Sequence, residues 1–212
     1  KIKEKNTKGL NITIPFKKKI IKHLNNLDKH SKEINAVNCV SIGGRTKGIN
    51  TDWIGYYNTL PKNKNLRKKK VLLIGYGGAA LAIHYVLLIK GFKNITVVNR
   101  SKKKLRFLNK TKFTSPIKSL DKYLSSSDLI INSTPLNPLS ERHVKLISNN
   151  TIVSDIVYKP KETEFLKQFP NNNKIYGISM LLQQAVPCFN MWFGFSPAID
   201  NKLMEILNEK IR

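Results

Sequence analysis

The chain has 212 residues, of which 41% are hydrophobic, and this is enough for one large or two small domains with a real core. No apolar run approaches the roughly 20 residues of a membrane span, and the first residues lack the apolar stretch of a secretory signal. We therefore expect a cytoplasmic protein with no membrane partner. The formal net charge of +25 would ordinarily indicate a nucleic-acid partner.

The distribution of this charge argues against nucleic acid. The basic residues are mostly lysines spread along the whole chain, whereas base readout favours arginine and single-strand binding uses interleaved aromatic residues. We predict no specific nucleic-acid partner, and a basic nucleic-acid-binding protein on the same fold remains the alternative outside the enzymes. Cys39 and Cys188 lie far apart without the spacing of metal ligands, so we expect buried thiols and no metal site.

The first section of the chain ends near residue 66 and mixes short strands with helices. Its pattern predicts a strand over 11–14 that stops at Pro15, a helix over 16–27, and a hairpin over 37–49. A further helix is expected to begin at Thr51 and to end at Pro61. The polar segment 62–70 that follows is the predicted linker.

The segment 69–101 carries the strongest motif. An apolar strand over 71–74 is followed by a glycine turn, a helix, and a second strand over 95–98. Gly75, Gly77 and Ala80 fill the G-x-G-x-x-A spacing, in which the first glycine turns the chain and the second lets backbone N–H groups approach a pyrophosphate. A dinucleotide site is therefore predicted at this turn.

The end of the second strand indicates which dinucleotide is bound. An NAD enzyme usually carries an acid there, for the ribose 2′-hydroxyl, whereas this chain has Asn99, Arg100 and Ser101, followed by three lysines. Cations at this place pair with the 2′-phosphate of NADP. The ordinary alternative is a solvated helix start in a lysine-rich protein, and we predict NADP.

Four predicted strands, at 71–74, 95–98, 128–132 and 152–156, alternate with helical segments. This pattern is typical of an α/β protein with a doubly wound, Rossmann-like parallel sheet. The last section, with helical spacing over 178–192 and 197–211, is expected to pack away from that sheet. We predict three parts: a substrate or catalytic domain over 1–66, an NADP-binding domain over 67–176, and C-terminal helices over 177–212.

Several segments together resemble the shikimate dehydrogenase family, in that family's order. They are Asn11–Lys17, Ala36–Asn38, Asn50–Asp52, the Gly75 turn, Asn99–Ser101, Asn132–Leu136, Asp155–Tyr158 and Met180–Ala185. The resemblance implies an NADP-dependent reduction of 3-dehydroshikimate to shikimate, on a two-domain fold whose C-terminal helices return to the substrate domain. It leaves a homodimer open. An NAD-dependent quinate/shikimate dehydrogenase is the rival enzyme, which Arg100 disfavours.

Lys17 and Asp52 are the candidate catalytic pair. Reducing a ketone requires a proton donor close to the hydride donor, and both residues stand at element ends that can face a cleft. Taken alone, they would be interpreted as a solvated lysine and a helix-start acid; the surrounding motifs match the family's catalytic lysine and aspartate.

The remaining site residues follow from the resemblance. Substrate binding falls to Asn38, Tyr158 and Gln184, with Gln183 as a neighbour that leaves the register open. The cofactor residues are Gly75, Gly77, Gly78, Ala79, Asn99, Arg100, Ser101, Lys104, Ser133, Thr134, Gly177 and Met180.

Three features depart from the family pattern. The stretch before Gly9 is much shorter than in the family and begins with lysine, so we expect a truncated chain that lacks the paired serines for the substrate carboxylate. Ser179 replaces a usual glycine, and Asn137–Pro138 replaces a usual Gly-Met pair. The last two weaken the nicotinamide assignment slightly.

Overall fold

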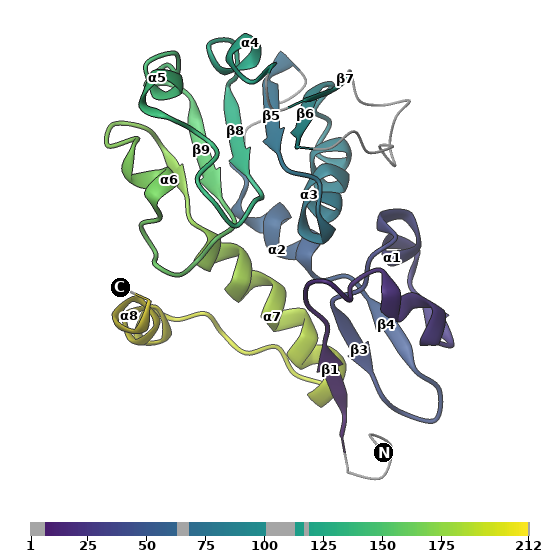
Figure 1. The fold of residues 1–212 in the computed structure, drawn as a ribbon. Coiled ribbons are helices and arrows are strands. Elements are labelled where there is room, and N and C mark those ends of the chain that lie inside the picture. Colours follow the sequence, from purple (N-terminus) through teal and green to yellow (C-terminus); the bar gives the residue numbers. More distant parts are fainter. Residues whose placement is uncertain (1–6, 63–67, 101–112, 117–118, 212) are drawn as a thin grey trace.

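The computed structural model describes residues 7–62, 68–100, 113–116 and 119–211, and these residues form two β-sheets with surrounding helices (Figure 1). The smaller sheet has the order β1-β3-β4-β2. Its strands are β1 (Gly9–Asn11), β2 (Asn26–Leu27), β3 (Cys39–Ser41) and β4 (Lys47–Ile49). Strands β3 and β4 pair antiparallel with Cys39 opposite Ile49, so the predicted hairpin is confirmed.

The predicted helix over 16–27 is wrong. The structure has a short 3-10 helix, η1 (Lys19–His23), then β2, and then α1 (Lys29–Ile34). Strand β2 pairs in parallel with β4, and the Asp28 side chain accepts a hydrogen bond from Ser31 N at 2.9 Å, which caps α1. Tertiary pairing and this cap therefore divide a segment whose spacing alone is helical.

The larger sheet is parallel and has the order β10-β9-β8-β5-β6-β7. All four predicted strands are present, and β7 and β10 are short edge strands that the sequence pattern did not reveal. The bounds are β5 (Lys70–Ile74), β6 (Asn94–Asn99), β7 (Phe113–Pro116), β8 (Leu129–Asn132), β9 (Ile152–Asp155) and β10 (Lys174–Ile175). Because β5 lies between β6 and β8, the strand order reverses there, where open α/β sheets bind their ligands.

Both faces of the larger sheet are covered, which explains the continuous apolar runs of its central strands. On one face, Leu73 joins a core with Tyr56 of α2 (Asp52–Thr59) and Ile83 of α3 (Gly78–Ile89). On the other face, Leu72 joins a core with Phe165. The helices on that second face are α4 (Asp121–Leu124), α5 (Glu141–Val144) and α6 (Glu164–Lys167).

Helix α7 (Gly177–Phe193) connects the two sheets. It begins beside the end of β9, where a Cβ on Gly177 would lie 2.4 Å from Val157 O. Near its other end, Trp192 Nε1 donates to Val40 O in β3 at 2.9 Å. Figure 1 shows α7 running from below the larger sheet to the side of β1 and β3.

Helix α8 (Asn201–Lys210) departs from the expectation that both C-terminal helices return to the first domain. Lys161 N, in the connection after β9, donates to Ile211 O at 2.8 Å. The reason is local, because Gly194 adopts a left-handed conformation at the end of α7 and Asp200 caps α8 by accepting from Leu203 N. In Figure 1, α8 lies on the same side of α7 as α6, below it and away from β1 and β3.

Candidate active site

Lys17 and Asp52 form the centre of the site. Ile12 N donates to Asn38 O at 2.7 Å and Val37 N donates to Lys17 O at 2.8 Å, so the segment after β1 loops back beside β3. Asp52 opens α2 directly after β4. Lys17 Nζ lies 2.5 Å from Asp52 Oδ2, with side-chain exposures of 13% and 7%. The structure thus brings the two candidate catalytic groups into direct contact in a largely dry place, where such a pair is stronger than on the surface.

Asn38 forms hydrogen bonds to Asp52 and to the neighbouring Thr51. Its Oδ1 accepts from Thr51 N at 2.6 Å, and its Nδ2 donates to Asp52 Oδ1 at 2.9 Å and Thr51 Oγ1 at 2.8 Å. Asn38 is buried. Since both oxygens of Asp52 are engaged, by Lys17 and by Asn38, the carboxylate is held in one orientation.

Gln184 reaches the same network from α7. Its Oε1 lies 3.1 Å from Asn38 Nδ2 and 3.1 Å from Thr51 Oγ1. Gln183 instead accepts from Asn58 in an exposed contact, so the structure places Gln184, and not its neighbour, beside Asn38. Thr51 was expected only as a helix cap, but its hydroxyl makes no capping bond. The sequence signal for its role in this network was its position within the Asn50–Asp52 motif.

A cavity of about 260 Å³ opens beside these residues. Its walls combine predicted substrate residues with predicted cofactor residues. They include Lys17, Asn38, Asp52, Tyr158 and Gln184 on the one hand, and Ala79, Gly177 and Met180 on the other. Tyr158 is 43% exposed at the rim. Asn11, Ile12 and Thr13 also line the cavity, although the sequence assigned them no role.

The glycine turn forms the opposite side of the site. Gly75 has a φ of +93°, and a Cβ there would lie 2.7 Å from Ser133 Oγ and 2.8 Å from Thr134 Cγ2. Gly77 faces open space, and no side chain caps the first turn of α3, which begins at Gly78. A positive φ, close packing and uncapped N–H groups at a helix start are the features that suit a pyrophosphate.

Ser133 and Thr134 pack against this turn through fixed hydroxyls. Ser133 Oγ donates to Ile74 O at 2.7 Å, and Thr134 Oγ1 donates to Asn132 Oδ1 at 2.7 Å. Arg100 is exposed directly after β6, and Asn99 is half-buried at the end of that strand. Ser101 and Lys104 lie outside the described residues, so the structure gives no position for these two predicted cofactor residues.

A buried pair behind the glycine turn was not predicted. The Tyr76 hydroxyl lies 2.9 Å from His84 Nδ1, and both residues are buried. Burial lowers the pKa of His84 to about 4, so the imidazole is neutral near pH 7 and can accept from the phenol. No local pattern joins a turn residue to a helix residue eight positions later, so the sequence could not show this contact.

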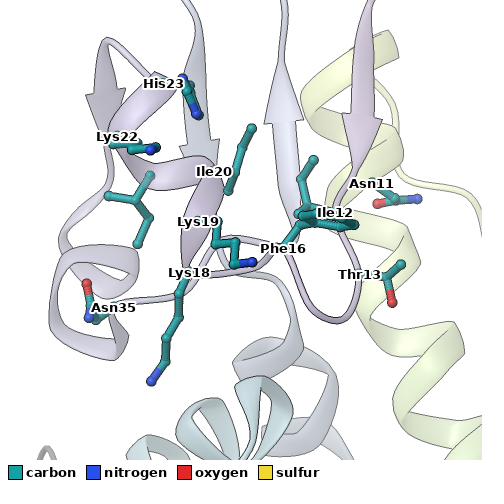
Figure 2. A pocket seen from close by; sticks show the side chains of 11 residues that line it. Asn11, Ile12, Thr13, Phe16, Lys18, Lys19, Ile20, Lys22, His23 and Asn35 are labelled. Carbon is teal, nitrogen blue, oxygen red and sulfur yellow. The ribbon is translucent and has the colours of Figure 1, made fainter.

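A second groove of about 910 Å³ lies on the outer side of the segment after β1 (Figure 2). Phe16, Ile20 and His23 line it, and none of them was assigned a role. Within the described part of the chain, no group of three or more His, Cys, Asp or Glu residues could hold a metal. In the same residues, no helix is both long and apolar enough to cross a bilayer.

Two family models match this chain. The model "Shikimate dehydrogenase substrate binding domain" matches residues 1–40. The model "Shikimate / quinate 5-dehydrogenase" matches residues 59–171. The first match contains Lys17 and Asn38, and the second contains the glycine turn.

Individual proteins agree with the family models. Shikimate dehydrogenase (NADP(+)) of Methanosphaera stadtmanae is 36% identical, over 92% of this chain and 76% of that protein. The structure of shikimate dehydrogenase from Aquifex aeolicus superposes with a TM-score of 0.82 at 31% identity, covering 99% of this chain and 78% of the other. The Thermus thermophilus enzyme in complex with NADP(H) and shikimate gives 0.80 at 26% identity, covering 100% and 81%.

Proposed function

The chain belongs to the shikimate dehydrogenase family, and we propose that it reduces 3-dehydroshikimate to shikimate with NADPH. The observation that carries this proposal is the single cavity in which Lys17, Asp52, Asn38 and Gln184 face Ala79 and Met180 from the cofactor side. A ketone bound there would have a proton donor on one side and the dinucleotide on the other.

The residues present fit the cofactor. The turn at Gly75 packs closely against Ser133 and Thr134, Gly77 faces open space, and the uncapped start of α3 offers N–H groups to a pyrophosphate. We propose that Gly75, Gly77, Gly78 and Ala79 hold this part of the cofactor. Asn99, Arg100, Ser101 and Lys104 are proposed at the adenosine ribose, and Ser133, Thr134, Gly177 and Met180 at the nicotinamide. NADPH, when bound, supplies the hydride.

The chain's own residues supply the proton and the orientation. Lys17 lies at hydrogen-bond distance from Asp52 and, in our proposal, gives a proton to the developing alkoxide at the carbonyl oxygen. Asp52 keeps the ammonium in place and accepts from a substrate hydroxyl. Asn38 and Gln184 offer amide donors and acceptors to the remaining hydroxyls, and Tyr158 closes the rim.

NADP is supported over NAD by charge and by relatives. Arg100 stands at the end of β6, where an NAD enzyme carries an acid, and the relative from Methanosphaera stadtmanae is named an NADP(+) enzyme. The family model names quinate as well as shikimate. A titration that found NADH preferred to NADPH, with turnover of quinate, would favour the rival NAD-dependent enzyme.

We also propose the domain boundaries, the cellular location and the assembly of the protein. The division at residues 66 and 176 is supported by the two sheets and by the start of α7. A cytoplasmic enzyme is our proposal for location, and a homodimer is our proposal for assembly. Light scattering of the purified protein tests the assembly, since a monomer mass at micromolar concentration would rule the dimer out.

The test of function is a steady-state assay. We expect the purified enzyme to oxidise NADPH with 3-dehydroshikimate, and to reduce NADP with shikimate faster than with quinate. No turnover on any of these substrates, by enzyme that binds NADPH, would overturn the assignment. Nucleic-acid binding is the outcome favouring the basic-protein alternative: it would have to survive physiological salt, where counterion release weakens nonspecific binding.

A further inference from the structure

The buried carboxylate of Asp155 has no part in the chemistry proposed above, although it lies at the edge of the site. Asp155 is the last residue of β9, and the strand register places it opposite Asn132, the last residue of β8. Both residues are buried. In Figure 1 the two strands end close above the start of α7. A pair of buried polar side chains therefore stands where two loops leave the sheet toward the site.

The two oxygens of Asp155 have different partners. Oδ1 accepts from Asn132 Nδ2 at 3.3 Å and from Val157 N at 3.0 Å. Oδ2 accepts from Thr163 Oγ1 at 2.7 Å, directly before α6. An ionised carboxylate accepts at both oxygens and donates at neither, so it suits three donors. Burial raises the pKa of Asp155, and the hydrogen bonds from these three donors oppose that shift.

Asn132 extends this contact into the loop after β8. Its Nδ2 also donates to Leu136 O at 3.1 Å, and its Oδ1 accepts from Thr134 N at 3.0 Å and from Thr134 Oγ1 at 2.7 Å. Thr134 packs against the glycine turn, where a Cβ on Gly75 would lie 2.8 Å from Thr134 Cγ2. Because Asp155 requires the NH2 group of Asn132 on its own side, the amide oxygen is left to hold Thr134.

The loop after β9 is held by the same carboxylate oxygen. Val157 N donates to Asp155 Oδ1. The backbone of this loop packs against the start of α7, where a Cβ on Gly177 would lie 2.4 Å from Val157 O and 2.6 Å from Ile156 O. Ile156 and Tyr158 line the substrate cavity. Asp155 Oδ1 therefore fixes the backbone that leads to Tyr158 and that supports the start of α7.

We propose that Asp155 is a positioning residue for hydride transfer, because its Oδ1 joins the loop that carries Thr134 to the loop that carries Tyr158. This proposal rests on the proposed function, since it assumes that the nicotinamide lies between the glycine turn and the start of α7. Asp155 does not line the cavity, so it acts through the two loops. A displacement of about 1 Å at the reacting groups can cost about a hundredfold in rate.

The first test compares two substitutions of the same residue. Asp155→Ala removes all three hydrogen bonds, whereas Asp155→Asn keeps an oxygen for the two loops and can donate its NH2 group to Thr163 Oγ1. We expect Asp155→Ala to lower kcat by roughly ten- to a hundredfold, and Asp155→Asn to retain most of the activity. Steady-state kinetics with NADPH and 3-dehydroshikimate measure this. Equal losses in the two variants would assign the effect to the charge and overturn the proposal.

A binding titration that needs no turnover locates the effect along the cofactor. Asp155→Ala should weaken the binding of NADPH, because the loops at the nicotinamide are displaced. Binding of adenosine 2′,5′-bisphosphate, which lacks the nicotinamide, should stay the same. Equal weakening of both ligands would show a general loosening of the larger sheet and overturn the proposal.

Thr163→Val is the matched control for stability. It removes the hydrogen bond to Asp155 Oδ2 and the cap on Leu166 N, but it leaves Oδ1 and both loops in contact. We expect a lower unfolding temperature, as for a lost helix cap, with kcat nearly unchanged. A fall in kcat as large as in Asp155→Ala would show that lost stability alone lowers turnover, against the proposal.

Asn132→Ala tests the same link from β8, and it serves also where Asp155→Ala does not fold. It should lower kcat by a similar factor, and full activity in this variant would overturn the proposal. The double variant should lose little more than either single variant, because residues in one hydrogen-bond network are not additive. Additive losses would show that Asp155 and Asn132 act separately, which also contradicts the proposal.

The proposal and the proposed function fail in different ways. Wild-type protein that binds NADPH and reduces no 3-dehydroshikimate would remove the substrate assignment, while a selective loss of NADPH binding in Asp155→Ala would still support the role of the loops. Active enzyme whose kcat ignores Asp155→Ala would remove the positioning role alone. Wild-type protein that binds no NADPH would overturn both.

Discussion

On one wall of the candidate active site, side chains bond to side chains: Asp52 accepts hydrogen bonds from Lys17 and Asn38, and Asn38 also donates to Gln184. On the opposite wall, the turn at Gly75 and the start of α3 offer backbone N–H groups and the absence of Cβ atoms. The first wall therefore depends on the functional groups of its side chains, whereas the second depends on the shape of the backbone. Removing a functional group should therefore damage the first wall, whereas adding a single carbon should damage the second.

The largest expected effect is on the wall of side chains. Lys17→Ala and Asp52→Asn should each lower kcat by roughly 10²–10⁴-fold, the usual contribution of a general acid or base, with little change in NADPH affinity. Steady-state kinetics with NADPH and 3-dehydroshikimate measure this. Lys22→Ala, which removes a lysine that lines the outer groove and not the cavity with Lys17 and Asp52, should keep kcat. A loss in Lys18→Ala as large as in Lys17→Ala would contradict the choice of Lys17.

On the backbone wall, the corresponding substitution is Gly75→Ala. The new methyl group would meet Ser133 Oγ at 2.7 Å in a left-handed backbone, and we expect a loss of about 3 kcal/mol in unfolding free energy from strain and overpacking. NADPH affinity should fall as well. Thermal unfolding with and without NADPH measures both. Gly44→Ala, which faces open space, is the control, and equal stability of the two variants would contradict the close packing.

A pH titration tests the buried Tyr76–His84 contact, which lies behind the glycine turn. His84 has a pKa of about 4 in the folded protein, against 6.5 when exposed. Between these two pH values the unfolded chain binds a proton at His84 that the folded chain does not. The free energy of unfolding therefore decreases by about 3 kcal/mol as the pH is lowered from neutrality to pH 4.

Substitution tests the origin of that loss. His84→Gln should remove this part of the pH dependence of the unfolding free energy, as measured by denaturant titration at several pH values. His23→Gln, at an exposed histidine, should keep it. An unchanged pH profile in His84→Gln would show that other groups cause the loss.

The smallest expected effect is at the edge of the cofactor wall. Arg100 is exposed, so Arg100→Ala should raise the KM for NADPH only about tenfold and narrow the preference for NADPH over NADH. The ratio of kcat/KM for the two cofactors measures this. Arg45→Ala, at an exposed arginine in the β3–β4 turn, is the control. An unchanged ratio would remove Arg100 from the 2′-phosphate.

The central strands of the larger sheet were predictable because burial on both faces demands unbroken apolar runs. The edge strands β7 and β10 were not, since short edge strands carry little apolar signal. In the smaller sheet, helical spacing over 16–27 gave the wrong element, because the pairing of β2 with β4 depends on residues twenty-one positions away. Hydrophobic periodicity shows which face of a local segment is buried, but it cannot show which distant strand the segment pairs with.

The candidate site shows the same limit. The motifs identified Lys17, Asn38, Asp52 and Gln184, and the structure places these four at one cavity. The motifs did not reveal that Thr51 links Asn38 to Gln184, nor that Tyr76 meets His84. Both facts depend on how elements cross in space. Resemblance identifies candidate ligand-binding residues more readily than the residues that hold them in place.

Helix α7 also sets an order of assembly. The described strands of the smaller sheet end at residue 49, yet Gln184 and Trp192, which bond to Asn38 and Val40, are synthesised much later. The whole larger sheet is made in between, and domains fold largely as they emerge from the ribosome. The nascent protein can therefore form its dinucleotide-binding sheet while its catalytic half still lacks a supporting helix. Gln184 can join Asn38 only after the described strands of the larger sheet have been synthesised.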